Sequence, residues 1–351
     1  MASAYLKSVD HPSAWRGSNF SSIDDVSFVL ESHHLAALDK ALKSVRAAGL
    51  TLNSVEKADF DLSPIADDIE QIKNEILYGR GIVILRNFPV HDYSLEDVEI
   101  LYWGFGCHLG LGESQSSMGD RLGHVRDVSG KDRNERAYRN SVDIMLHTDL
   151  ADIVGMLSIN KSERGGLSTY TSAVALHNEI LATRPDYLEP LYQGFRYHRF
   201  GEQAPGEPPV TDHRVPVLSQ KADVVSARFV PEYVYMAAEE LGEPIAPFDR
   251  AALEYFNDLA CSPELRFDVM LAPGDLSLIN NYTVLHARDA FYDGDEAHQK
   301  RLLLRLWLST DHNRPLVENL EIFTRRGIAP QQRESTYYTG VTDTASKLGH
   351  S

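Results

Sequence analysis

The feature that most constrains the fold is a series of short apolar runs that starts near Leu146. The runs are rich in β-branched and aromatic residues, and Gly, Pro, Asp and Asn separate them. This rhythm is typical of an antiparallel sandwich or barrel. We therefore predict a mainly β fold. The clearest predicted strands cover residues 153–159, 224–230, 267–271, 276–280 and 302–309.

Amphipathic helices are predicted to flank these strands. Ser63 and Pro64 suit a helix start, because a capping hydroxyl precedes a proline at the first helical position. Apolar residues then recur at helical spacing until Gly79 and Gly81, and residues 81–85 are predicted to form a buried strand. The apolar positions of this helix are Ile65, Ile69, Ile72, Ile76 and Leu77. The other predicted helices cover residues 35–45, 172–183, 230–241 and 248–259.

The chain has 351 residues, of which 43% are hydrophobic, and this is enough for a substantial core. No linker-like stretch of low complexity divides the sequence, so we expect a single domain. Within it, residues 1–78 form a helical lead-in, residues 79–310 the β core with helical insertions, and residues 311–351 a C-terminal extension.

Composition argues against several classes of protein. The formal charge of −17 repels phosphate backbones, so nucleic acid is not an expected partner. The two cysteines, Cys107 and Cys261, form no CxxC pattern, which excludes zinc-finger and thioredoxin chemistry. The N-terminus lacks the apolar run of a signal peptide, and no stretch approaches the roughly 20 apolar residues of a membrane span. We expect a cytoplasmic protein without a membrane partner.

The strongest local motif is His147-Thr148-Asp149. In an extended segment His147 and Asp149 point to the same face, where the two side chains can grip one metal ion. The motif alone is weak, since about one His-x-Asp is expected by chance in a chain of this composition. A second candidate, His177-Asn178-Glu179, falls in a predicted helix, where positions two apart do not share a face. His177 is therefore interpreted as a structural residue.

A distant segment supplies what the first motif lacks. Pro273-Gly274-Asp275 predicts a turn, the strand at residues 276–280 follows, and His286 comes shortly after Asn280-Asn281. A third ligand on a late strand closes a two-histidine, one-carboxylate triad that leaves coordination positions open.

The strand at residues 301–308 alternates between leucine at the even positions and a face that carries two arginines. Arg301, Leu303, Arg305 and Trp307 share the face opposite the leucines. Buried arginines need anionic partners. A dicarboxylate cosubstrate would supply one through bidentate pairing. The alternative is that both arginines pair with Asp or Glu residues of the scaffold.

At residues 79–307 the chain resembles the TauD/TfdA-type 2-oxoglutarate-dependent dioxygenases. The resemblance rests on the order and spacing of several motifs. These are Gly79-Arg80-Gly81-Ile82-Val83, His147-Thr148-Asp149, Gly165-Gly166-Leu167-Ser168, Ala175-Leu176-His177-Asn178-Glu179, Pro273-Gly274-Asp275, Asn280-Asn281 to His286, and Arg301 to Trp307. It implies a double-stranded β-helix, the cupin-like jelly roll, flanked by helices.

The resemblance also implies roles for individual residues. His147, Asp149 and His286 would ligate Fe(II) and form the catalytic centre. Arg301 and Ser168 would bind the distal carboxylate of 2-oxoglutarate. The stretch at residues 287–300 is a little longer than in taurine dioxygenase.

Two further residues are assigned by the same resemblance. Arg305 would face the primary substrate or the other end of the cosubstrate, and Asp143 lies in the region that shapes the substrate pocket. Tyr138, Arg139 and Asn140 would line a lid or form a solvated loop. Phe291 and Tyr292 are interpreted as packing residues.

The implied reaction consumes O2 and 2-oxoglutarate, releases succinate and CO2, and oxidises a C–H bond of a small, anionic substrate by hydroxylation, desaturation or ring closure. Two alternatives stay open. One is a non-haem iron oxidase on the same fold without 2-oxoglutarate, and the other is a non-catalytic, ligand-binding jelly roll. The resemblance also leads us to expect a homo-oligomer.

Overall fold

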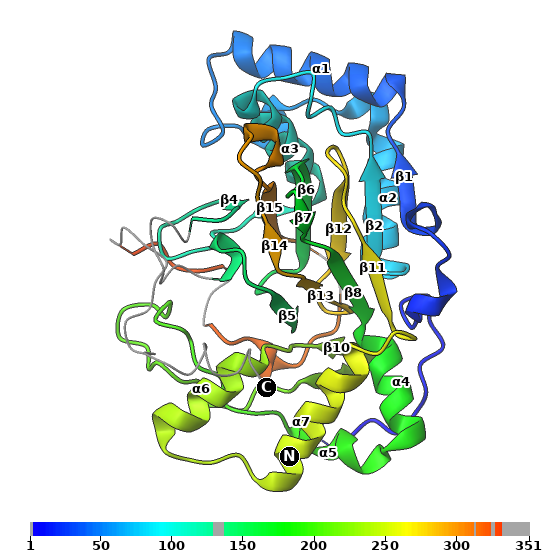
Figure 1. Ribbon diagram of the computed structural model, residues 1–351, viewed down its shortest axis with the longest axis vertical. Coiled ribbons are helices and arrows are strands. Elements are labelled where there is room, and N and C mark those ends of the chain that lie inside the picture. Colours follow the sequence, from blue (N-terminus) through cyan, green and yellow to red (C-terminus); the bar gives the residue numbers. More distant parts are fainter. Residues whose placement is uncertain (1–2, 129–136, 312–313, 324–326, 332–351) are drawn as a thin grey trace.

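The computed structural model describes residues 3–128, 137–311, 314–323 and 327–331, and two facing sheets form its centre (Figure 1). In the larger sheet the order is β1-β2-β12-β6-β15-β3, and β4 also pairs with β15. Only β1 runs parallel to its neighbour among these described pairs. The strands are β1 (Ser27–Val29), β2 (Ile82–Arg86), β3 (Leu111–Gly112), β4 (Leu122–Val125), β6 (Ile153–Asn160), β12 (Leu276–Asn280) and β15 (Leu302–Ser309).

The smaller sheet has the antiparallel order β11-β8-β13-β5. Its strands are β5 (Ile144–His147), β8 (Ser168–Ser172), β11 (Arg266–Val269) and β13 (Val284–Arg288). The chain passes from β12 in one sheet to β13 in the other through a short turn. Two small hairpins complete the described strands, β7 (Arg164–Gly165) with β14 (Phe291–Tyr292), and β9 (Leu218–Lys221) with β10 (Val224–Ala227). The architecture is the predicted jelly roll.

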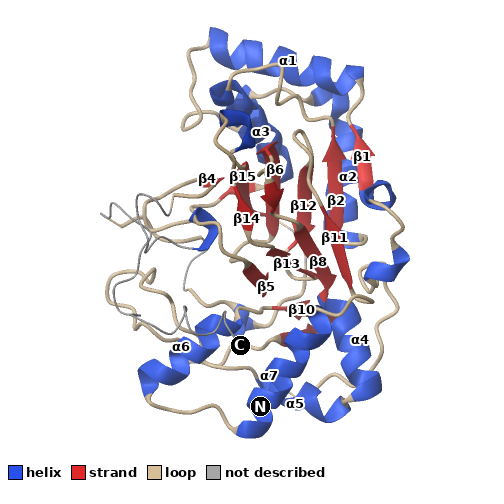
Figure 2. Cartoon of the chain, viewed as in Figure 1, coloured by secondary structure: helices blue, strands red, loops and turns tan. Residues whose placement is uncertain are grey.

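Helices cover the outer face of the larger sheet and one end of the molecule (Figure 2). The even-numbered leucines of β15, Leu304, Leu306 and Leu308, share one core cluster with residues of α1, α2 and α3, so they face a packed layer, as their alternation predicts. Ile82, Val154 and Trp307 face the other way and pack with Tyr170 and Phe267 of the smaller sheet. The first group of helices is α1 (Ser32–Ala47), α2 (Ala66–Tyr78) and α3 (Leu95–Leu109); the second is α4 (Ala173–Thr183), α5 (Leu188–Gln193), α6 (Pro231–Leu241) and α7 (Pro247–Ala260).

Several predicted boundaries differ from those of the structure. The helix expected at Ser63 begins with a 3-10 turn, Ser63–Ile65, and the Ser63 side chain caps nothing. The strand predicted at 224–230 ends at Ala227, since Pro231 starts α6. The lead-in is not wholly helical, because β1 extends the larger sheet. About half of the predicted C-terminal extension, residues 332–351, lies outside the described residues. Within the described part of the chain, the helices are too short or too polar to cross a bilayer.

Candidate metal centre

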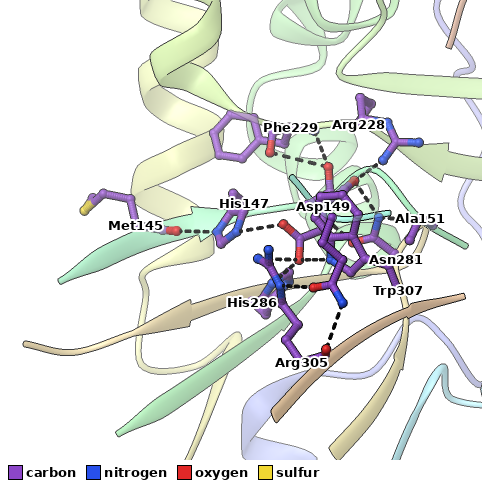
Figure 3. Close-up of polar contacts among 12 residues, drawn as sticks. Met145, His147, Asp149, Ala151, Arg228, Phe229, Asn281, His286, Arg305 and Trp307 are labelled. Carbon is purple, nitrogen blue, oxygen red and sulfur yellow. Dashed lines mark hydrogen bonds and ion pairs between the residues drawn. The ribbon is translucent and has the colours of Figure 1, made fainter. Parts of the chain in front are cut away.

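His147, Asp149 and His286 converge on one point (Figure 3). His147 and His286 are register partners on the neighbouring strands β5 and β13, and their ring centres lie 4.3 Å apart. The Nε2 atom of His147 lies 3.6 Å from Asp149 Oδ1, and that of His286 lies 3.5 Å from Asp149 Oδ2. One ligating atom from each residue falls within 4.8 Å of the others. The structure therefore brings the three predicted ligands together.

The position of Asp149 does not come from strand alternation, because β5 ends at His147. Thr148 turns away, as predicted, and its hydroxyl accepts a hydrogen bond from the Phe229 N–H. The Asn281 side chain holds the backbone of Asp149 with two hydrogen bonds, which we call the Asn281 clamp. It accepts from the Asp149 N–H at 2.9 Å and donates to the Asp149 carbonyl at 2.6 Å. Arg228 donates to the same carbonyl. The sequence marked Asn280-Asn281 as a motif, but this clamp was not foreseen.

The Asp149 carboxylate is held in its charged form. Burial raises its pKa, but the opposing effects of Arg305 and the two imidazoles win and hold the pKa well below its usual range. Trp307 donates its indole N–H to Asp149 Oδ2 at 2.8 Å, and Arg305 Nη1 lies 3.5 Å from that same oxygen. Trp307 is a contact that the sequence reasoning missed, although the alternation of β15 had placed it on the correct face.

The hydrogen bond at the far side of His147 fixes its tautomer. Its Nδ1 lies 2.9 Å from the carbonyl of Met145, so this nitrogen carries the proton and donates. In the neutral ring the lone pair is then on Nε2, which lies on the side of Asp149, where a metal ligand requires it. Burial lowers the pKa of His147, but the hydrogen bond and charge of Asp149 outweigh it and raise the pKa. Burial lowers the pKa of His286, which favours the neutral, ligating form of this ring.

Arg305 is buried beside this triad and is already partly paired. Its Nε donates to Gln115 Oε1 at 2.8 Å, and its guanidinium lies 4.5 Å from the ring centre of Tyr138. Together with the contact to Asp149, this agrees in part with the alternative of scaffold pairing. One atom, Nη2, is buried without a hydrogen-bond partner and is free to meet a ligand.

Arg301 differs from Arg305, because no carboxylate of the described residues forms an ion pair with it. Its backbone N–H binds Asp293, but Nη1 of its buried side chain has no partner. Gly166 explains how the guanidinium fits: a Cβ there would lie 2.9 Å from the Arg301 Nε, and the positive φ of 79° also favours glycine. Ser168, two residues further on, is buried at the start of β8.

Three other predicted residues have clear positions. Asp143 is exposed just before β5 and interacts electrostatically with Arg288. His177 is structural, as predicted: its Nε2 donates to the Lys7 carbonyl and its Nδ1 accepts from Tyr192. Phe291 is buried as expected, whereas Tyr292 is 62% exposed, so its assignment to packing was wrong.

A second cluster of ligating residues, His33, His34 and Asp68, lies between α1 and α2. His34 Nδ1 accepts the Glu31 N–H at the start of α1, so its Nε2 carries the proton and donates to Asp68 at 3.2 Å. This nitrogen has no lone pair for a metal while the cap is intact. The cluster is therefore a link between two helices.

A cavity of about 400 Å³ lies elsewhere, between residues 17–23 and 263–270. No histidine, cysteine or glutamate lines it, and its Arg266 and Asp268 pair with each other at 3.0 Å. The chemistry of the molecule is therefore assigned to the triad.

A buried two-histidine, one-carboxylate triad inside a jelly roll defines the class of mononuclear non-haem iron(II) oxygenases. The profile of the family described as "Taurine catabolism dioxygenase TauD, TfdA family" matches residues 46–307. The chain belongs to this family and is a 2-oxoglutarate-dependent non-haem iron dioxygenase. The resemblance drawn from the motifs is confirmed.

Two curated relatives span most of the chain. FR-33289 synthase of Streptomyces rubellomurinus is 26% identical over 327 residues, covering 91% of this chain and 96% of the relative. The taurine hydroxylase-like protein SAT17 of Stachybotrys chartarum is 24% identical over 306 residues, covering 84% of this chain and 77% of the relative.

Solved structures agree on the fold. An asparagine oxygenase in complex with Fe(II), 3-hydroxyasparagine and succinate superposes with a TM-score of 0.64 at 15% identity, covering 87% of this chain and 100% of its own. The non-haem iron oxygenase OrfP with Fe and α-ketoglutaric acid gives a TM-score of 0.57 at 14% identity, with 86% and 99% covered.

Proposed function

We propose that this chain binds Fe(II) through His147, Asp149 and His286 and oxidises a C–H bond of a small, anionic substrate, with conversion of 2-oxoglutarate to succinate and CO2. The observation that carries the proposal is the convergence of these three donors. The described residues add no fourth ligating side chain to the cluster. Open coordination positions therefore remain for the cosubstrate and O2.

Arg301 and Ser168 are proposed to bind the distal carboxylate of 2-oxoglutarate. A buried guanidinium with an unpaired N–H and no ion-pair partner among the described residues favours an anion at this position. The bound iron and cosubstrate supply the oxidation chemistry, and the protein orients them and excludes water. The clamp of Asn281 and the indole of Trp307 hold the carboxylate ligand in one orientation.

The anionic group of the primary substrate is assigned to Arg305, through its unpaired Nη2 beside the Tyr138 ring. Two structural neighbours support a substrate with a carboxylate, because the asparagine oxygenase holds 3-hydroxyasparagine and OrfP holds 3-hydroxy-arginine. Both ligands are hydroxylated, which favours hydroxylation over desaturation or ring closure. Asp143 is kept as a residue of the pocket rim.

The single-domain organisation, the cytoplasmic location and a homo-oligomeric state remain predictions from the sequence.

An anaerobic titration of the apoprotein with Fe(II) and then 2-oxoglutarate tests the proposal. We expect one iron per chain and a visible metal-to-ligand charge-transfer band that appears only when both are present. Small carboxylic acids are then screened for perturbation of the band and for turnover with stoichiometric succinate. Iron binding without the band would point to the oxidase alternative, and no iron binding would remove the metal assignment.

A further inference from the structure

Arg288 lies at the end of β13, two residues after His286, and is only 6% exposed. On the neighbouring strand its register partner is Ser168, and that of His286 is Tyr170. Because side chains alternate along a strand, these four residues point into the interior from one face of the smaller sheet. Arg288 therefore stands directly opposite the hydroxyl proposed to bind 2-oxoglutarate.

The hydrogen bonds of Arg288 are incomplete. Its Nη2 donates to the carbonyls of Asn140 and Val142, but the buried Nε and Nη1 have no acceptor. No ion pair to this side chain exists among the described residues. Leaving such donors unpaired in the interior costs free energy, and the cost is larger for a charged group than for a neutral one.

Arg288 and Arg301 share the same surroundings. Their guanidinium carbons lie 4.8 Å and 5.1 Å from the centre of the buried Phe291 ring. Arginine keeps its proton at neutral pH, so these two buried groups are cations that lie close together and are short of acceptors.

We propose that Arg288 and Arg301 together bind the distal carboxylate of the cosubstrate, one from each side of Ser168. A carboxylate offers about four lone-pair sites, enough for donors of two guanidiniums and one hydroxyl. The inference rests on the proposed function and adds a binding residue to it.

Arg288 has a second consequence for the site. The carbonyls that it holds, those of Asn140 and Val142, belong to the segment that leads into β5, and β5 ends at the metal ligand His147. One side chain thus touches both the cosubstrate position and the segment that carries a ligand. Binding of the carboxylate fixes the guanidinium and with it this segment.

The test compares two cosubstrate analogues of equal carbon number on the iron-loaded, anaerobic protein. 2-Oxoglutarate carries the distal carboxylate, whereas 2-oxopentanoate has a methyl group in its place. Affinities are read from the charge-transfer band. We expect Arg288→Gln and Arg301→Gln each to lower the affinity for 2-oxoglutarate about tenfold or more. The affinity for 2-oxopentanoate should not change in either variant. Arg288→Lys keeps the positive charge but loses the bidentate guanidinium, so its affinity for 2-oxoglutarate should lie between those of the unaltered protein and Arg288→Gln.

Arg199→Gln is the matched control for loss of a buried arginine. Arg199 is buried and donates to the carbonyls of Ile322, Pro208 and Val210, away from the triad. The Arg199→Gln variant should bind 2-oxoglutarate and 2-oxopentanoate with unchanged affinities. If Arg288→Gln weakens both analogues equally, or neither, Arg288 only braces the segment before β5 and the inference is wrong. If the unaltered protein binds iron but no 2-oxoglutarate, the proposed function itself fails.

Discussion

The part of the chain that the structure describes contains two clusters of two histidines and one aspartate, and only one of them is built as a metal centre. His147, Asp149 and His286 come from separate strands and the segment after β5, and they meet in the interior. His33 and His34 are adjacent at the start of α1 and face Asp68 of α2, with His33 exposed. The residue types are identical, so composition cannot separate the two clusters.

The difference lies in the proton on the second ring nitrogen. The Met145 carbonyl accepts from His147 Nδ1, which leaves a lone pair on Nε2 facing Asp149. At His34 the Glu31 N–H donates to Nδ1, so Nε2 keeps its proton and donates to Asp68. The backbone group behind each imidazole thus decides whether the residue ligates a metal or links two helices.

The largest effect is expected from loss of a triad ligand. His147→Ala should abolish iron binding and turnover, because only two donors remain in the cluster. The fold should stay intact. The measurements are iron stoichiometry and circular dichroism. His34→Ala is the matched control and should retain one iron per chain; loss of iron from that variant, or activity in His147→Ala, would reverse the comparison.

Buried arginines with unpaired N–H groups, such as Arg301, lie near the triad. Arg301→Ala should raise the apparent KM for 2-oxoglutarate by about tenfold to a hundredfold, since a charged hydrogen-bonded pair is lost. Steady-state kinetics with varied cosubstrate measure it. An unchanged KM would move the role to Arg305.

An effect of similar size, on the affinity for iron, is expected at the indole behind Asp149. Trp307→Phe removes the N–H that occupies Oδ2, and contacts behind a ligand typically contribute tenfold to a hundredfold to metal affinity. The dissociation constant of Fe(II) should rise within that range, and the charge-transfer band should shift. Trp103→Phe is the control, since this buried indole donates to the Val55 carbonyl remote from the triad. Equal effects from the two variants would show that Trp307 only supports packing.

The smallest effect is expected at the helix link. Asp68→Ala removes the acceptor for His34 and should lower the free energy of unfolding by about 1 kcal/mol or less, because the carboxylate is partly exposed. Denaturant unfolding measures the loss, and iron content should not change. A fall in iron stoichiometry would contradict the assignment of this cluster to structure.

The sequence predicted the triad because its signals are local or periodic. His147-Thr148-Asp149 is contiguous, His177 was set aside by its helical spacing, and the alternation of β15 assigned Arg301 and Trp307 to the interior. The same alternation, with leucine at every even position, predicted which face of β15 meets a packed layer. The family motifs then joined the two distant halves of the site.

Contacts between remote segments were decided only by the tertiary structure. Asp149 lies beyond the end of β5, so the clamp from Asn281, and not strand alternation, sets its direction. The pairing of Arg288 with Ser168 follows from the register between β8 and β13, which no local pattern encodes. The tautomers of His147 and His34 depend on the carbonyl or N–H that the folded backbone presents to each ring. A sequence lists the groups that carry protons and charges, but only packing brings each donor to its acceptor.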